Sequence, residues 1–207
     1  MPIVEEYRRI VARLENRPEL PALRPEYVWH PGLDAEIAKL PLAELAGDRP
    51  DDAANAQALI AALHLWNDSL DAAHMLVQDL TASTGSALHG IMHRLEGDYG
   101  NAKYWFRRAG DHPAWHGLQS RAARWLQEEK SGGRLPGGTI GDALNAIATQ
   151  GMWNPYLFTD AVAMTAGGNG SGAASGTGSA QAGREVLEHL QGLELSSFIR
   201  YLESRLE

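Results

Sequence analysis

The sequence predicts an all-α fold of stacked antiparallel helical hairpins in a single domain. Apolar residues recur every three to four positions along most of the 207-residue chain, which is the period of amphipathic helices. No stretch shows the two-residue alternation expected of a half-buried strand. Breakers such as "SGGRLPGG" (131–138) divide the pattern into segments of helical length.

Composition narrows the class of protein. Hydrophobic residues make up 44% of the chain and charged residues 21%, as in soluble globular proteins. The net charge of −8 argues against a nucleic-acid partner, because such proteins neutralise phosphates with Lys and Arg. The absence of cysteine excludes disulfides, thiolate nucleophiles and Cys-ligated zinc. The charged start "MPIVEEYRR" is unlike a signal peptide, and no apolar run is long enough to cross a membrane, so we expect a cytoplasmic protein with no membrane partner.

The first helix is expected at 3–14, where apolar residues occupy one face. Residues 17–33 are proline-rich and should form an irregular segment that wraps around the helical body. Asp34 is the predicted cap of a short helix at 34–40, and Asp51 should open the next helix. Further helices are predicted at 67–80, 86–96, 99–109, 114–129 and 139–149.

The last third contains one helix start and one low-complexity segment. Asn154 is a predicted cap with Pro155 in the first turn of a helix. Residues 166–183, "AGGNGSGAASGTGSAQAG", are predicted to be a flexible loop, since Gly, Ser and Ala bury little apolar surface. An amphipathic helix, with Leu187 and Leu190 on its apolar face, should end the chain.

Two segments about thirty residues apart align with each other. Aligning residues 67–80, "NDSLDAAHMLVQDL", with residues 97–110, "GDYGNAKYWFRRAG", pairs Asp68 with Asp98 and keeps the apolar positions in register. Each follows one predicted helix and opens another. The alignment therefore suggests two consecutive helical hairpins.

Residues 86–113 resemble a tetratricopeptide repeat. Gly90 stands where that repeat has a small residue, "GDY" at 97–99 matches its turn, and His89 and His93 depart from its usual packing residues. The small-large-small pattern of its second helix is matched by Ala102, Phe106 and Ala109. The block is also similar to a group of uncharacterised bacterial and fungal proteins that share the core "H..MHR.EGDY.NAKYWFRR". The first resemblance implies helical-hairpin geometry, and neither implies an activity.

Two predicted helices carry polar stripes that we expect to face each other. On 86–96 the stripe spans about 60° and lies apart from the apolar face. It consists of His89, His93 and Glu96. A similar stripe on 67–80 consists of Asn67, Asp71, His74 and Gln78. If the helices are antiparallel neighbours, these side chains converge on a polar seam between them.

Three interpretations of this seam are open. It is a hydrogen-bonded structural network, a pocket for a small ligand without metal, or a divalent metal site. In the metal interpretation His74, His89 and His93 are the ligands of Zn, Fe, Ni or Mn, and Glu96 is the candidate catalytic base. The sequence requires no cofactor, and the spacing "HxxxHxxE" lacks the internal glutamate of zinc peptidases.

A basic and aromatic run follows the seam. Its candidate ligand-binding residues are Tyr104, Arg107, Arg108 and His112. Arginines beside aromatic rings suit carboxylates, phosphates or stacked rings, although a solvated basic helix end has the same composition. We therefore expect a helical-repeat-like protein that binds a protein partner or small ligand at the seam. The alternative is a metal-dependent enzyme of hydrolase or oxygenase type.

Overall fold

The computed structural model of the chain describes residues 2–46, 49, 51–166 and 177–206, and within them the protein is all-α, as predicted, with no strand. Eleven α-helices and one 3-10 turn form the described part. They are α1 (Pro2–Glu15), α2 (Pro31–Ile37), α3 (Leu42–Leu45), α4 (Asp52–Trp66), α5 (Leu70–Val77), α6 (Ser83–Glu96), α7 (Tyr99–Ala109), η1 (Pro113–Trp115), α8 (Leu118–Ser131), α9 (Gly138–Ala148), α10 (Pro155–Ala166) and α11 (Thr177–Leu206). No helix among these residues is long and apolar enough to cross a membrane.

The segment between α1 and α2 is irregular, as its prolines predict, but the predicted cap of α2 is wrong. The helix begins at Pro31, and the ring Nδ1 of His30 accepts the Leu33 N–H at 2.9 Å. Proline suits a first turn because its missing N–H would lack a helical partner there. Asp34 lies inside the helix, where its carboxylate contacts His64 Nδ1 at 2.7 Å.

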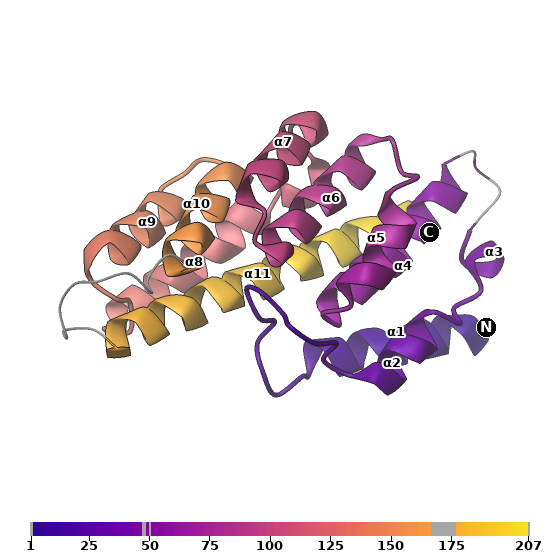
Figure 1. Cartoon of the computed structure of the whole chain (residues 1–207), viewed down its shortest axis with the longest axis horizontal. Coiled ribbons are helices and arrows are strands. Elements are labelled where there is room, and N and C mark those ends of the chain that lie inside the picture. Colours follow the sequence, from indigo (N-terminus) through magenta and orange to yellow (C-terminus); the bar gives the residue numbers. More distant parts are fainter. Residues whose placement is uncertain (1, 47–48, 50, 167–176, 207) are drawn as a thin grey trace.

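Helices α4 to α7 form two hairpins that stack side by side (Figure 1). The predicted helix at 67–80 is shortened to α5, which begins only at Leu70. Asn67 ends α4 and donates its side-chain amide to the His30 carbonyl oxygen and the Asp34 carboxylate. Asp68 has a φ of 60°, a left-handed conformation that breaks the helix.

The hairpin of α6 and α7 depends on two glycines. Gly97 has a φ of 84° in the turn, and the carboxylate of Asp98 then caps α7 by accepting the Asn101 N–H at 3.1 Å. At Gly90 a Cβ atom would lie 2.5 Å from the ring of Phe106. The absent side chain therefore lets the two helices approach closely.

In the C-terminal half, Asn154 Oδ1 accepts the N–H groups of Tyr156 and Leu157 at 3.0 Å, which confirms the predicted start of α10. The predicted loop at 166–183 is too long at its C-terminal side, because α11 already includes 177–183. Its central part, 167–176, lies outside the described residues.

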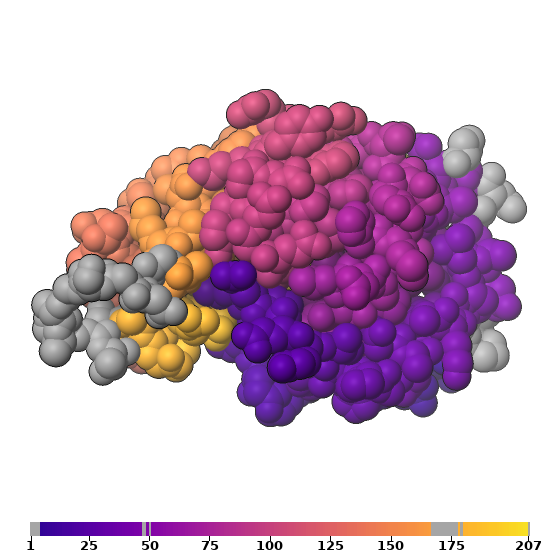
Figure 2. Space-filling view, in the orientation of Figure 1, coloured from indigo at the N-terminus to yellow at the C-terminus, as the bar shows by residue number. Residues whose placement is uncertain are grey.

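Helix α11 runs along the molecule and packs on α4, α8, α9 and α10 (Figure 1). Its apolar stripe, including Leu187, Leu190 and Phe198, is buried in one core shared by both halves. The Tyr7 hydroxyl donates to the Glu203 carboxylate at 2.8 Å, and the chain ends lie at the same end of the molecule. The space-filling view shows the N-terminal segment lying against the hairpins and α11 (Figure 2).

Candidate functional site

Helices α5 and α6 bring three histidines together at their packed edge. The ring centroids are 6.0 Å apart for His74 and His89, 6.2 Å for His74 and His93, and 6.1 Å for His89 and His93. We call these three residues the histidine triangle. Helical periodicity predicted that they converge, and the structure places them so.

Hydrogen bonds fix the tautomers of two rings. His89 Nδ1 lies 3.2 Å from the Gly85 carbonyl oxygen, which only accepts, so Nδ1 carries the proton. His93 Nδ1 donates in the same way to the Glu96 carboxylate at 2.7 Å, while the Asn101 amide donates to His93 Nε2 at 3.2 Å. Both rings therefore carry their lone pair on Nε2.

Packing and electrostatics keep His89 neutral. The ring is 4% exposed and stacks on Trp105, with centroids 4.1 Å apart and planes 11° from parallel. Burial lowers the pKa of His89; the Gly85 hydrogen bond opposes this shift, and electrostatic repulsion from the neighbouring His93, His74 and Arg108 adds to it. The Nε2 lone pair is thus retained at neutral pH.

The third histidine differs from the other two. His74 is exposed, and its ring makes no hydrogen bond within the described part of the chain. Asp71, the carboxylate one turn earlier on α5, is also exposed. Glu96 is not an independent base in this arrangement, since it holds the ring of His93.

In this conformation no group of three or more His, Asp or Glu side chains among the described residues stands ready to hold a metal ion. The ring spacing explains why. Tetrahedral zinc with nitrogens at about 2.0–2.1 Å separates imidazole centroids by about 5 Å, roughly 1 Å less than in the triangle. Because His89 and His93 are themselves 6.1 Å apart, rings on both α5 and α6 would have to move for three imidazoles to surround an ion.

The structure separates several predicted site residues from the triangle. Asn67 is fully buried and serves the connection between α4 and α2. Gln78 is exposed at the end of α5, where its side chain donates to the Met75 carbonyl oxygen. His112 is 1% exposed and lies in the core against Phe198.

The basic run is only partly beside the triangle. The Arg108 guanidinium lies 5.1 Å from the centroid of the Trp105 ring and donates to the Tyr104 hydroxyl at 3.3 Å. Through Trp105, these two residues adjoin His89. Arg107 is exposed on α7 and forms no hydrogen bond or ring contact with the triangle within the described chain.

Sequence reasoning missed two residues that contact the triangle, Asn101 and Trp105. They lie four positions apart on α7, with Arg108 three positions further, so one face of α7 lies against the histidines. The same helical projection applied to 99–109 would have found this face.

No protein-family model matches this sequence, and no curated protein or solved structure shows significant similarity to it. The tetratricopeptide resemblance of 86–113 therefore stays a prediction.

Proposed function

We propose that this is a ligand-binding helical protein whose ligand at the polar seam is a divalent transition-metal ion, with the histidine triangle as its binding centre. One observation carries the proposal. Three imidazoles from two helices lie at 6.0–6.2 Å from one another, and two of them have Nε2 lone pairs set by hydrogen bonds at Nδ1. At His93 the ion would replace the Asn101 amide, which donates to Nε2 in this structure. Metal-binding histidines have this support, in which the second ring nitrogen donates to a carbonyl or carboxylate.

A purely structural network fits the three residues less well. In such a network each ring is buried and hydrogen-bonded, because an unpaired buried polar group is costly. His89 is buried and hydrogen-bonded, and His93 is half-buried and hydrogen-bonded, but His74 is exposed and without a partner in the described chain. The exposed ring of His74, next to the hydrogen-bonded rings of His89 and His93, supports its role as a third metal ligand.

Neutral imidazoles favour zinc or nickel over harder ions such as manganese. Three protein ligands would leave a coordination position for water, which makes a metal-dependent hydrolase the second candidate function. In that case Glu96 would orient His93 and would not itself act as the base, because its carboxylate is engaged by that ring.

The first test is elemental analysis of untagged protein purified without chelator, followed by calorimetric titration with zinc and nickel chloride. We expect about one equivalent of metal per chain. His74→Ala should weaken binding by at least about tenfold without loss of stability, because the ring is exposed and makes no hydrogen bond to any described residue.

The matched control is His116→Ala, which removes an exposed histidine outside the triangle and should leave metal binding unchanged. No bound metal, together with no heat of binding for either ion, would refute the proposal. Equal affinities of His74→Ala and the unaltered protein would also contradict it.

A further inference from the structure

A cavity of about 400 Å³ lies where the irregular segment after α1 meets the C-terminal end of α6 and the facing ends of α7, α10 and α11. In Figure 2 the tip of the N-terminal segment meets the later helices in this region. The volume lies within the range of small-molecule sites, roughly 300–1,000 Å³. Buried Leu23 and Leu95 contribute apolar wall, and the remaining lining is mainly polar.

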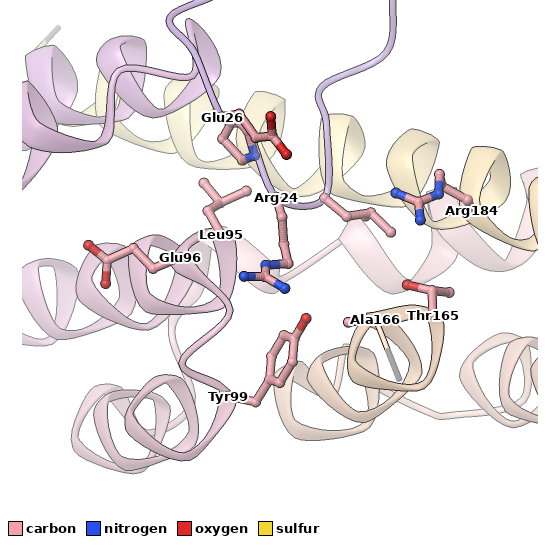
Figure 3. Close-up of a pocket in the computed structure, with 10 residues that line it drawn as sticks. Arg24, Glu26, Leu95, Glu96, Tyr99, Thr165, Ala166 and Arg184 are labelled. Atoms are coloured by element: carbon pink, nitrogen blue, oxygen red, sulfur yellow. The ribbon is translucent and has the colours of Figure 1, made fainter. Parts of the chain in front are cut away.

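Two arginines from distant parts of the sequence line this cavity. Arg24 belongs to the irregular segment and Arg184 to α11, and in Figure 3 the Arg24 guanidinium lies beside Tyr99 while Arg184 lies apart from it, on the side of Thr165. Neither forms an ion pair or side-chain hydrogen bond with another described residue, in contrast to Arg9, Arg13 and Arg17. Both side chains are exposed and outside any ion pair of the described chain, although the charge of Arg184 acts on the Glu188 carboxylate one turn further along α11.

Arg24 packs on the turn between α6 and α7. Its Nε lies 2.6 Å from the position that a Cβ atom of Gly97 would occupy. Gly97 thus provides both the left-handed turn and the space for the guanidinium group. The Arg24 side chain is exposed, so its guanidinium group is accessible to an anion.

Tyr99 supplies a third donor. Its hydroxyl is buried without a hydrogen-bond partner within the described residues, and in Figure 3 it points toward Arg24. Burial raises the pKa of Tyr99, while the charges of Arg24, Arg94 and Arg184 oppose the shift. The hydroxyl is therefore protonated at neutral pH and available to donate.

Two carboxylates also line the cavity, but neither pairs with these arginines. Glu96 points away from Arg24 in Figure 3 and accepts the hydrogen bond from His93. Glu26 is exposed and forms no ion pair within the described chain. The lining therefore holds two arginines and two glutamates, and the guanidinium groups of Arg24 and Arg184 are outside ion pairs with these two carboxylates.

We infer that this cavity binds a small molecule through a phosphate group, held by Arg24 and Arg184 with a hydrogen bond from the Tyr99 hydroxyl. Two guanidinium groups match the two charges of a phosphate monoester, and arginine binds phosphate oxygens in bidentate geometry. The apolar remainder of the molecule would pack on Leu23 and Leu95. This site is separate from the proposed metal centre, although Glu96 adjoins both.

The test is calorimetric titration of the full chain, dialysed free of metal, with phenyl phosphate, inorganic phosphate and benzoate at constant ionic strength. Phenyl phosphate should bind most tightly and benzoate at least about tenfold more weakly. Arg24→Gln and Arg184→Gln should each weaken phenyl phosphate binding by about tenfold or more, and Tyr99→Phe by about threefold to tenfold.

Two controls make the result specific. Arg8→Gln removes an exposed arginine outside the cavity and should leave the affinity unchanged. His74→Ala should also bind phenyl phosphate normally, so that failure of the metal proposal and failure of this one are distinguishable. Absence of saturable binding, equal affinity for benzoate, or unchanged affinity in the Arg24→Gln and Arg184→Gln variants would overturn the inference.

Discussion

His112 is buried in the core, where its hydrogen bonds and packing favour the neutral imidazole. Its Nδ1 accepts the Ala114 N–H at 3.1 Å, so the proton is on Nε2, which lies 3.0 Å from the Thr84 hydroxyl. The ring also stacks on Phe198 with centroids 5.1 Å apart. Burial, aided by the charge of His116 and opposed by Asp111, lowers the pKa of His112 to about 4.

This pKa predicts an acid-sensitive stability. Between an ordinary pKa of 6.5 and the folded value of about 4, the unfolded chain binds a proton at His112 that the native protein does not. The free energy of unfolding therefore falls as the pH falls through this window, by about 3 kcal/mol in total from this residue. Urea denaturation at a series of pH values between about 7 and 4 measures the slope.

His112→Asn is the matching control, because asparagine offers an acceptor to the Ala114 N–H but does not titrate. The variant should be less stable at neutral pH, having lost the stacked ring, yet its stability should fall less steeply with acid. Some slope should persist, since burial also lowers the pKa values of His89 and His189. A slope identical to that of the unaltered protein would show that His112 titrates normally.

At the level of elements, the close approach of α6 and α7 depends on Gly90. In Gly90→Ala the new Cβ would overlap the Phe106 ring at 2.5 Å. The gain in helix propensity, up to about 1 kcal/mol, should be outweighed by repacking, so we expect a net loss of about 1–2 kcal/mol in the free energy of unfolding. Urea denaturation monitored by circular dichroism tests this.

Gly100→Ala is the matched control in the same hairpin. A Cβ at Gly100 would meet only Asp98 Oδ1, at 3.8 Å, an ordinary contact distance. The substitution should therefore be neutral or stabilise α7 by up to about 1 kcal/mol. If Gly90→Ala were as stable as Gly100→Ala, the packing of α6 against α7 would not require glycine.

The features that the sequence predicted correctly are those that depend on residues close together in the chain. The period of apolar residues and local caps such as Asn154 predicted most helices, because those signals lie within one turn. The start of α5 was missed because Asn67 ends α4 in a contact with His30, which is 37 residues away. The triangle was predicted from two adjacent helices, whereas the contribution of Trp105 needed the tertiary placement of α7.

At the level of the whole molecule, a buried ion pair joins the hairpins to α11. Arg94 and Glu194 are both fully buried and paired, and the Trp153 indole N–H donates to the same carboxylate at 3.0 Å. The Arg94 guanidinium also lies 4.5 Å from the centroid of the Phe158 ring. Because Arg94 follows His93 directly, α6 presents the triangle on one side and anchors the core on another.

Removing one member of this pair should leave an uncompensated charge in the core. Arg94→Met alone and Glu194→Leu alone should each reduce the free energy of unfolding by about 3–5 kcal/mol. The double variant should recover most of that loss, because no buried charge remains; only the Trp153 hydrogen bond, about 1 kcal/mol, stays broken. Denaturation of all four proteins gives the coupling energy, and additive losses would contradict a paired role. Metal binding per folded molecule should persist in the double variant, since the triangle faces away from the core pair and depends on α6 only for its position.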